Sequence, residues 1–247
     1  MVTTARTISV AENVPGRRYD HVFFSGMALL ILVTVFLGFA RTYYLAGLFR
    51  APLPSLIVHF HGAAFSCWIF LLLMQTWLIA ARRVHIHRRL GIAGFTLACL
   101  MVVLGVWVNN RALTRGGVPP DADGAAIYLL GFALLLIFAV VVILAFYSRS
   151  NPAAHKRLIL VATVALLPAA IIRLPFAFVS VGLARPAWLS YPFLLMLVLY
   201  DLWSSHKIHR ATLAAGTFLI FTEQLVIALD HTAKAQAFAS WMYSLLL

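Results

Sequence analysis

The chain has 247 residues, of which 63% are hydrophobic and only 11% are charged. Soluble domains are typically about 45–50% apolar and about 25% charged, so this composition excludes an ordinary soluble fold and predicts a polytopic membrane protein. The formal net charge of +12 would suggest a nucleic-acid partner in a soluble protein. Here the basic residues stand in short runs at helix ends, which is the usual topology signal of a membrane protein, so we expect no nucleic acid.

Seven apolar segments are each long enough to cross a hydrocarbon core of about 30 Å as a helix. Their predicted limits are 22–46, 56–81, 90–109, 126–147, 157–183, 187–204 and 211–230. We therefore expect an all-α, seven-transmembrane-helix bundle over residues 22–230, preceded by a polar tail at residues 1–21. Residues 231–247 include Trp241 and Tyr243, which favour the membrane–water interface, and so predict a short interfacial helix.

The distribution of basic residues predicts the orientation of the bundle. Of the 19 lysines and arginines, the N-terminal tail and the loops after the second, fourth and sixth spans hold twelve, and the opposite side holds six. Positive residues concentrate in cytoplasmic loops, so we expect the N-terminus in the cytoplasm and the C-terminus outside, in a bacterial inner membrane. The same excess predicts contact with anionic lipids on the cytoplasmic side. The last span has no lysine for a retinal Schiff base, which argues against a rhodopsin.

Two histidines, His59 and His61, lie near the outer end of the second span. Residues two apart on a helix point about 200° apart, so the two rings cannot face one partner. His59 shares its face with the small residues Gly62 and Ser66, which let another helix approach, while His61 shares its face with Phe65. Ionisable residues within spans usually face the bundle interior and serve function. The alternative is that both histidines only bond to loop carbonyls or water.

Arg173 lies between Pro168 and Pro175 in the fifth predicted span. An unpaired charge in hydrocarbon is costly, so the arginine needs a counter-charge. At 1.5 Å per residue, Arg173 is about 24 Å and Glu223 about 18 Å from the cytoplasmic ends of their helices. We expect Arg173 and Glu223 to form a polar core by pairing directly or through water, either as a structural ion pair or as part of a site that faces His61.

The cytoplasmic side carries five histidines in addition to the basic residues that topology requires: His85, His87, His155, His206 and His209. Three of them, His87, His155 and His209, each precede one or two basic residues and then an apolar helix. Histidine can ligate haem iron or zinc, and basic neighbours can hold propionates, phosphates or a quinone headgroup. The alternative is that these histidines only bond to lipid headgroups. We expect Asp201, nearby, to pair with Lys207 or Arg210, or to cap the chain turn.

The polar motifs and their order along the chain resemble those of a known family. The residues that carry the resemblance are His59-Phe-His61-Gly62, Gln75, His87-Arg-Arg-Leu-Gly91, His155-Lys-Arg-Leu158, Arg173-Leu-Pro175, Tyr200-Asp201-Leu202 and His209. From about Val35 onward the chain resembles a family of uncharacterised multi-pass bacterial inner-membrane proteins, which implies a location but no activity. The motif that begins at His87 is also similar to membrane b-type cytochromes and haem-handling proteins of respiratory assembly, which implies a haem site.

The hypothesis that we favour from the sequence is a redox or cofactor-binding membrane protein. His87, together with His155 or His209, would ligate haem b near the cytoplasmic face. His61, with His59 beside it, would serve a second, outer site. The protein would then transfer single electrons between a quinol-like donor and an acceptor.

Two other hypotheses remain open. The first is a small-molecule or proton-coupled transporter, in which Glu223 titrates, His61 relays protons and Arg173 lies on a moving, proline-kinked span. The second is a non-catalytic assembly or sensory subunit whose polar core is purely structural. The sequence contains no hydrolase motif, phosphate loop or dinucleotide fingerprint that would indicate another enzyme class.

Overall fold

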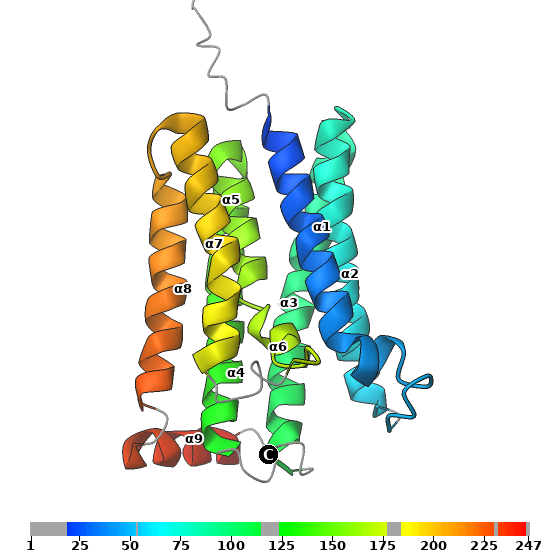
Figure 1. Cartoon of the computed structure of the whole chain (residues 1–247), viewed down its shortest axis with the longest axis vertical. Coiled ribbons are helices and arrows are strands. Elements are labelled where there is room, and N and C mark those ends of the chain that lie inside the picture. The colour runs from blue at the N-terminus through cyan, green and yellow to red at the C-terminus, as the bar shows by residue number, and fades with distance from the viewer. Residues whose placement is uncertain (1–18, 53, 115–123, 177–183, 230–231, 246–247) are drawn as a thin grey trace, which may run out of the picture.

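The computed structural model describes residues 19–52, 54–114, 124–176, 184–229 and 232–245. This part of the chain is almost entirely helical and contains no strand. Seven of its helical segments are long and apolar enough to cross a membrane (Figure 1). The protein is therefore a multi-pass membrane protein built as an all-α seven-helix bundle, which confirms the predicted fold class.

The seven spans run up and down through the bundle in chain order (Figure 1), and the chain also forms a short helix within the fifth span and a last helix after the seventh. The helices are α1 (Asp20–Phe39, continued by a π-helical turn at Ala40–Tyr44), α2 (Leu56–Ala80), α3 (Val84–Thr114), α4 (Gly124–Tyr147), α5 (Pro152–Val164), α6 (Pro168–Ile171), α7 (Ala184–Ser205), α8 (Arg210–Leu229) and α9 (Ala233–Leu245). The third span begins at Val84 rather than at the predicted residue 90. We call the end of the bundle where α3, α5 and α8 begin the basic end, and the opposite end the α9 end.

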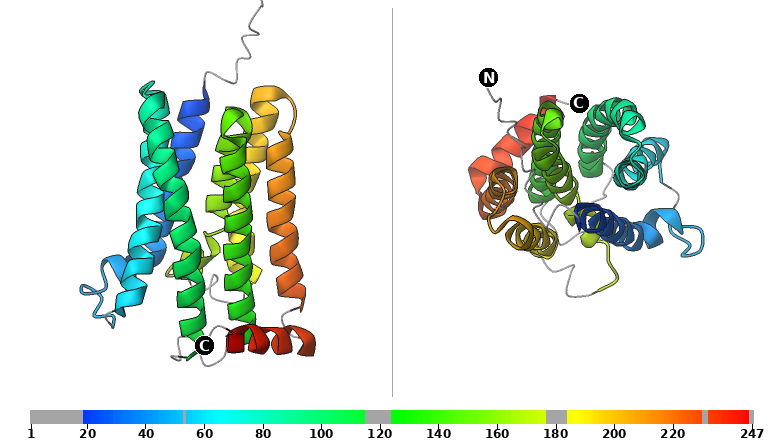
Figure 2. Two further views of the ribbon diagram at one scale, coloured as in Figure 1. Left: turned by 180° about the vertical axis from the view of Figure 1, so that it is seen from behind. Right: turned by 90° about the horizontal axis from the view of Figure 1, so that it is seen from above.

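The packing centres on α4, which lies against α3, α5, α8 and α9. Its residues Ile137, Phe138 and Val141 are fully buried in the apolar core. Seen along the bundle, α1, α2 and α3 form one group and α4, α5, α7 and α8 form another (Figure 2). A buried hydrogen bond of 3.2 Å from Trp68 Nε1 to Thr163 Oγ1 joins α2 of the first group to α5 of the second.

The fifth span differs from the continuous helix predicted over residues 157–183. The α5 helix ends at Val164, and α6 covers only Pro168–Ile171 before the chain continues in turns as far as Leu174. Proline lacks a backbone N–H and its ring clashes with the preceding helical turn, so Pro168 ends α5 and Pro175 prevents α6 from continuing. The rest of the predicted span, residues 177–183, lies outside the described residues. Because α6 stops short of the α9 ends of α3 and α4, the turn that follows it lies within the length of the bundle (Figure 1).

The last helix, α9, lies across the end of the bundle rather than along the spans (Figures 1 and 2). It packs against α4 and exposes Phe238 and Trp241, whose ring centroids are 5.7 Å apart. This is the position expected for an interfacial helix, which lies in the plane of the membrane surface. Residues 1–18 of the predicted polar tail lie outside the described residues.

Candidate functional site

Two of the predicted cofactor ligands meet at the basic end of the bundle. His87 is the fourth residue of α3 and His155 is the fourth residue of α5, so the two similar motifs place their histidines at equivalent points of two helices. The centroids of the two imidazole rings are 6.4 Å apart, and the ring planes are nearly perpendicular, at 87°. This histidine pair is the candidate site that the structure supports best.

The ring of His155 is held in place by the end of α4. Its Nδ1 lies 2.8 Å from the backbone carbonyl oxygen of Ala145. A carbonyl oxygen can only accept a hydrogen bond, so Nδ1 carries the proton and a neutral His155 keeps its lone pair on Nε2. Histidines that bind metals are usually held by a backbone carbonyl or a carboxylate in this way.

The surroundings of His87 contain unsatisfied polar atoms and a glycine. Gln75 donates a 3.2 Å hydrogen bond from Nε2 to the His87 carbonyl, yet Gln75 Oε1 and His87 Nδ1 are both buried without any hydrogen-bond partner. Gly91 lies one turn after His87, and a Cβ there would contact only Gln75 Nε2, at 3.7 Å. Each unsatisfied buried group costs about 1–3 kcal/mol, which is expected where a ligand supplies the missing contacts.

His209, the third candidate ligand, does not join this pair in the described part of the chain. Its Nδ1 accepts a 3.1 Å hydrogen bond from the N–H of Ala211, so the ring caps the beginning of α8. Burial, and after it the positive charge of Arg157, lowers the pKa of His209. Three further histidines of this end, His21, His85 and His206, are exposed.

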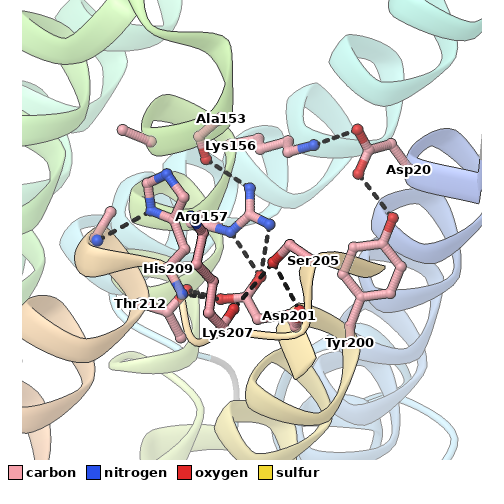
Figure 3. A network of polar contacts seen from close by, with 12 residues as sticks. Asp20, Ala153, Lys156, Arg157, Tyr200, Asp201, Ser205, Lys207, His209 and Thr212 are labelled. Carbon is pink, nitrogen blue, oxygen red and sulfur yellow. Dashed lines mark hydrogen bonds and ion pairs between the residues drawn. The ribbon is translucent and has the colours of Figure 1, made fainter. Parts of the chain in front are cut away.

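A network of polar contacts lies at the basic end of the bundle (Figure 3). At its centre, Arg157 donates to Asp201 Oδ1 from Nη2 at 2.6 Å and from Nε at 2.8 Å, and both side chains are buried. The other carboxylate oxygen of Asp201 accepts hydrogen bonds from the His209 N–H at 3.0 Å and from Thr212 Oγ1 at 2.6 Å. The network therefore joins α5, α7 and α8.

The partner of Asp201 differs from the prediction. We expected Lys207 or Arg210, which are close in sequence, whereas the structure pairs Asp201 with Arg157, 44 residues away. The reason is the packing of α5 against α7, which brings a buried arginine closer than the exposed loop residues. The predicted capping role is confirmed, because Asp201 accepts the hydrogen bond from the His209 N–H.

Asp20 extends the network to α1. It accepts a 2.7 Å hydrogen bond from the Tyr200 hydroxyl and lies 2.5 Å from Lys156 Nζ. The carboxylate oxygens of Asp20 and Asp201 thus all have partners, in contrast to the unsatisfied atoms of His87 and Gln75. We interpret this network as structural.

The two histidines of α2 face different partners, as the helical geometry predicts. His59 is exposed, and its carbonyl accepts a 3.2 Å hydrogen bond from the Tyr43 hydroxyl. The small residues on its face contact the π-helical turn, where the Tyr43 ring lies against Gly62. His61 instead lies beside Phe65, with ring centroids 4.2 Å apart, and its Nδ1 is buried without a hydrogen-bond partner in the described part of the chain.

The expected direct pair between Arg173 and Glu223 is wrong, because the described residues contain no ion pair between them. Arg173 donates to the Ala169 carbonyl, and its guanidinium lies 4.9 Å from the centroid of the Phe39 ring. Glu223 is fully buried on α8, and neither of its carboxylate oxygens has a hydrogen-bond partner in the described part of the chain. The cause is the position of α6, which packs against α1 and α7, whereas α8 packs against α4, α5 and α7.

No family model, curated protein or solved structure matches the chain. The function therefore has to be inferred from the geometry of the site. Among the described residues, no group of three or more His, Cys, Asp or Glu side chains could hold a metal ion. A bare zinc ion usually takes three or four protein ligands, whereas haem brings its own ring nitrogens and needs only one or two from the protein. The two-histidine donor set therefore fits haem better than zinc.

Proposed function

We propose that the protein is a redox protein of the bacterial inner membrane that binds haem b between His87 and His155 and transfers single electrons. The observation that carries the proposal is the spacing of the two rings. Two imidazoles that bind one metal ion from opposite sides, with bonds of about 2.0–2.1 Å and roughly 1.1 Å from each nitrogen to its ring centre, would have ring centroids about 6.3 Å apart. The observed separation is 6.4 Å.

The surroundings of the pair support the same proposal. The Ala145 carbonyl leaves Nε2 of His155 available as a ligand. Gly91, one turn from His87, carries no side chain that would obstruct a flat ring approaching the helix. Arg88 and Arg89, exposed beside His87, supply positive charge for propionates. Haem supplies the one-electron chemistry, and these residues hold and orient it.

The location and orientation form part of the proposal. The basic end carries the loops with most of the lysines and arginines, so it would lie in the cytoplasm next to anionic lipids. The haem would then be close to the cytoplasmic surface, where a quinol-like donor in the bilayer and a soluble acceptor can both reach it. The resemblance to multi-pass bacterial inner-membrane proteins supports this location.

The test is an absorption spectrum of detergent-purified protein from haem-replete cells, oxidised and then reduced with dithionite. We expect a Soret band and sharp α and β bands in the reduced wild type, and loss of most bound haem in His87→Ala and in His155→Ala. The exposed histidines of the same end provide matched controls, so His85→Ala and His206→Ala should keep the wild-type haem content. Free imidazole should restore the spectrum of His87→Gly, which separates loss of a ligand from loss of the fold.

Two results would contradict the proposal. The first is a colourless, iron-free wild type from haem-replete cells. The second is an equal loss of haem in His85→Ala and His87→Ala, because His85 lies only two residues away and is not paired with His155 in the described part of the chain.

The transport hypothesis has less geometric support. It requires Glu223, Arg173 and His61 to act together, but Glu223 is buried on α8, which packs against α4, α5 and α7, whereas Arg173 lies against Phe39 of α1. These groups do not form one site, so the structure supports haem binding better than coupled transport.

A further inference from the structure

Glu223 is a buried carboxyl group that belongs neither to the histidine pair nor to the network at the basic end. The residue is 0% exposed, and neither of its carboxylate oxygens has a hydrogen-bond partner in the described part of the chain. Asp201 is equally buried, but hydrogen bonds reach both of its oxygens. An ionised carboxylate without a donor or a cation is far costlier to bury than a neutral acid. Glu223 therefore calls for a positively charged ligand.

The helices around Glu223, as far as the structure describes them, offer no cation at its depth. The α8 helix packs against α4, α5 and α7. Three stretches of these helices contain no ionisable side chain: residues 129–146 of α4, 158–164 of α5 and 192–199 of α7. Lys156 and Arg157 of α5 are bound in the network at the basic end, and Arg173 lies against the Phe39 ring of α1. The positive charge that Glu223 needs must therefore come from a ligand.

Tyr191 is the titratable side chain of α7 that lies at the depth of Glu223. At 1.5 Å per residue, Tyr191 is about 21 Å from the basic end of α7, and Glu223 is about 20 Å from that of α8. The two helices touch at this depth, because Gln224 donates a 2.8 Å hydrogen bond from Nε2 to the Tyr191 hydroxyl. A tyrosine hydroxyl is neutral at physiological pH, so Tyr191 adds a polar neighbour but no charge.

A proton fits these surroundings better than a metal ion or an organic cation. Metal ions such as Ca²⁺ and Mg²⁺ need about six or more oxygen ligands. Thr163 has the only side-chain oxygen in residues 129–146 and 158–164. That oxygen already accepts a hydrogen bond from Trp68 and donates one to the Ile159 carbonyl. An organic cation would have to reach two buried oxygens, whereas a proton needs neither space nor further ligands.

We propose that Glu223 is a proton-binding site inside the membrane, where its carboxyl group holds a proton at pH 7. Proton binding neutralises the carboxylate and so removes the cost of burying its charge. Carboxyl groups within membrane spans are the groups from which proton relays are built. The site contains no residue of the histidine pair, so it does not depend on haem binding.

The experiment compares infrared spectra of the full-length, detergent-purified wild type and Glu223→Gln at pH 7, in light and in heavy water. The C=O stretch of a protonated carboxyl group lies above the bands of a carboxylate and shifts in heavy water. A solvated glutamate is ionised at pH 7, so the wild type should show a protonated-carboxyl band that Glu223→Gln lacks. Asp20→Asn is the matched control, because Asp20 binds Lys156 and its removal should take away carboxylate bands instead.

A sodium titration distinguishes the proton from a metal cation. Replacing choline chloride by sodium chloride at pH 7 should leave the band of the protonated carboxyl group unchanged. Conversion of this band into carboxylate bands by sodium would assign Glu223 to a metal ion and overturn the proposal. Loss of carboxylate bands, rather than of the protonated band, in Glu223→Gln would also overturn it.

Thermal unfolding provides a measurement that does not depend on the spectrum. Glutamine is neutral and has the shape of a protonated glutamate, so Glu223→Gln should keep the Tm within about 4 °C of the wild type. Asp201→Asn, which removes an equally buried carboxylate with a cationic partner, should lower the Tm more. A fall of Tm in Glu223→Gln as large as in Asp201→Asn would show that Glu223 is ionised and paired, and would overturn the proposal.

Discussion

The buried ion pair between Arg157 and Asp201 makes a sharp prediction about stability. The side chains of Arg157 and Asp201 are 6% and 0% exposed, respectively. Removing one partner of such a pair leaves an uncompensated buried charge and costs about 3–5 kcal/mol. For a protein of this size, 1 kcal/mol corresponds to about 2–4 °C in Tm. Asp201→Asn should therefore lower the Tm by about 6–20 °C.

The matched control is the second ion pair of the same network. Lys156 and Asp20 are 25% and 29% exposed, and pairs of this kind usually contribute about 0–1 kcal/mol. Lys156→Ala should therefore lower the Tm by no more than about 4 °C. Both variants can be followed in detergent by the fluorescence of the six tryptophans.

A double-mutant cycle isolates the pair from other effects of each substitution. The double variant Arg157→Met with Asp201→Asn should lose less stability than the sum of the losses in the two single variants. The reason is that each single change leaves the other group buried and unpaired. If Asp201→Asn lowered the Tm no more than Lys156→Ala, or if the two single losses added, the network would not be the structural element that we describe.

Two further predictions concern packing and pH. Gly38→Ala should destabilise the protein by about 1–3 kcal/mol, because its Cβ would lie 2.2 Å from the Ala170 carbonyl oxygen of α6. Gly26→Ala, in the same helix but with nothing within 4 Å of its Cβ, should be neutral or stabilising; equal losses in thermal unfolding would contradict this. The lowered pKa of His209 means that the unfolded chain binds a proton more readily than the folded one, so stability should fall as the pH drops below the ordinary value of 6.5. His209→Asn keeps an acceptor for the Ala211 N–H and should reduce the loss of Tm between about pH 7.5 and 5.5; an unchanged loss would exclude this cause.

The number of spans and the shared depth of the two histidines follow from local patterns. The length of an uninterrupted apolar run decides whether a helix can cross the membrane, and this property is contained in the run itself. The motifs at His87 and His155 each begin a helix at the same end of the bundle, so their histidines share a depth. Whether two helices at that depth are also close depends on packing, which is why the sequence left His155 and His209 as equal alternatives for the second ligand.

The two wrong pairings have the same physical cause. Helical rise predicts depth, and on depth alone Glu223 was the best partner for Arg173. Depth says nothing about the order of the helices around the bundle, and that order places α8 away from the turn after α6. For Asp201, the prediction relied on closeness in sequence, which also says nothing about how the helices pack. A burial argument could have identified the partner of Asp201, since a buried carboxylate needs a buried cation. Arg157 lies within α5, whereas Lys207 lies in the loop between α7 and α8.

The two polar clusters at the basic end depend on each other through α5. His155 and Arg157 are two residues apart on this helix, so their side chains point about 200° apart. On one face Arg157 binds Asp201, which fixes α5 against α7 and α8. On the other face His155 meets the Ala145 carbonyl and the ring of His87. A site that holds a cofactor through two ligands tolerates errors of only about 0.5 Å in the position of each ligand, so each ligand needs a rigid support behind it. The satisfied network provides that support for His155, and this explains why a structural ion pair stands one half-turn from a histidine whose neighbours remain unsatisfied.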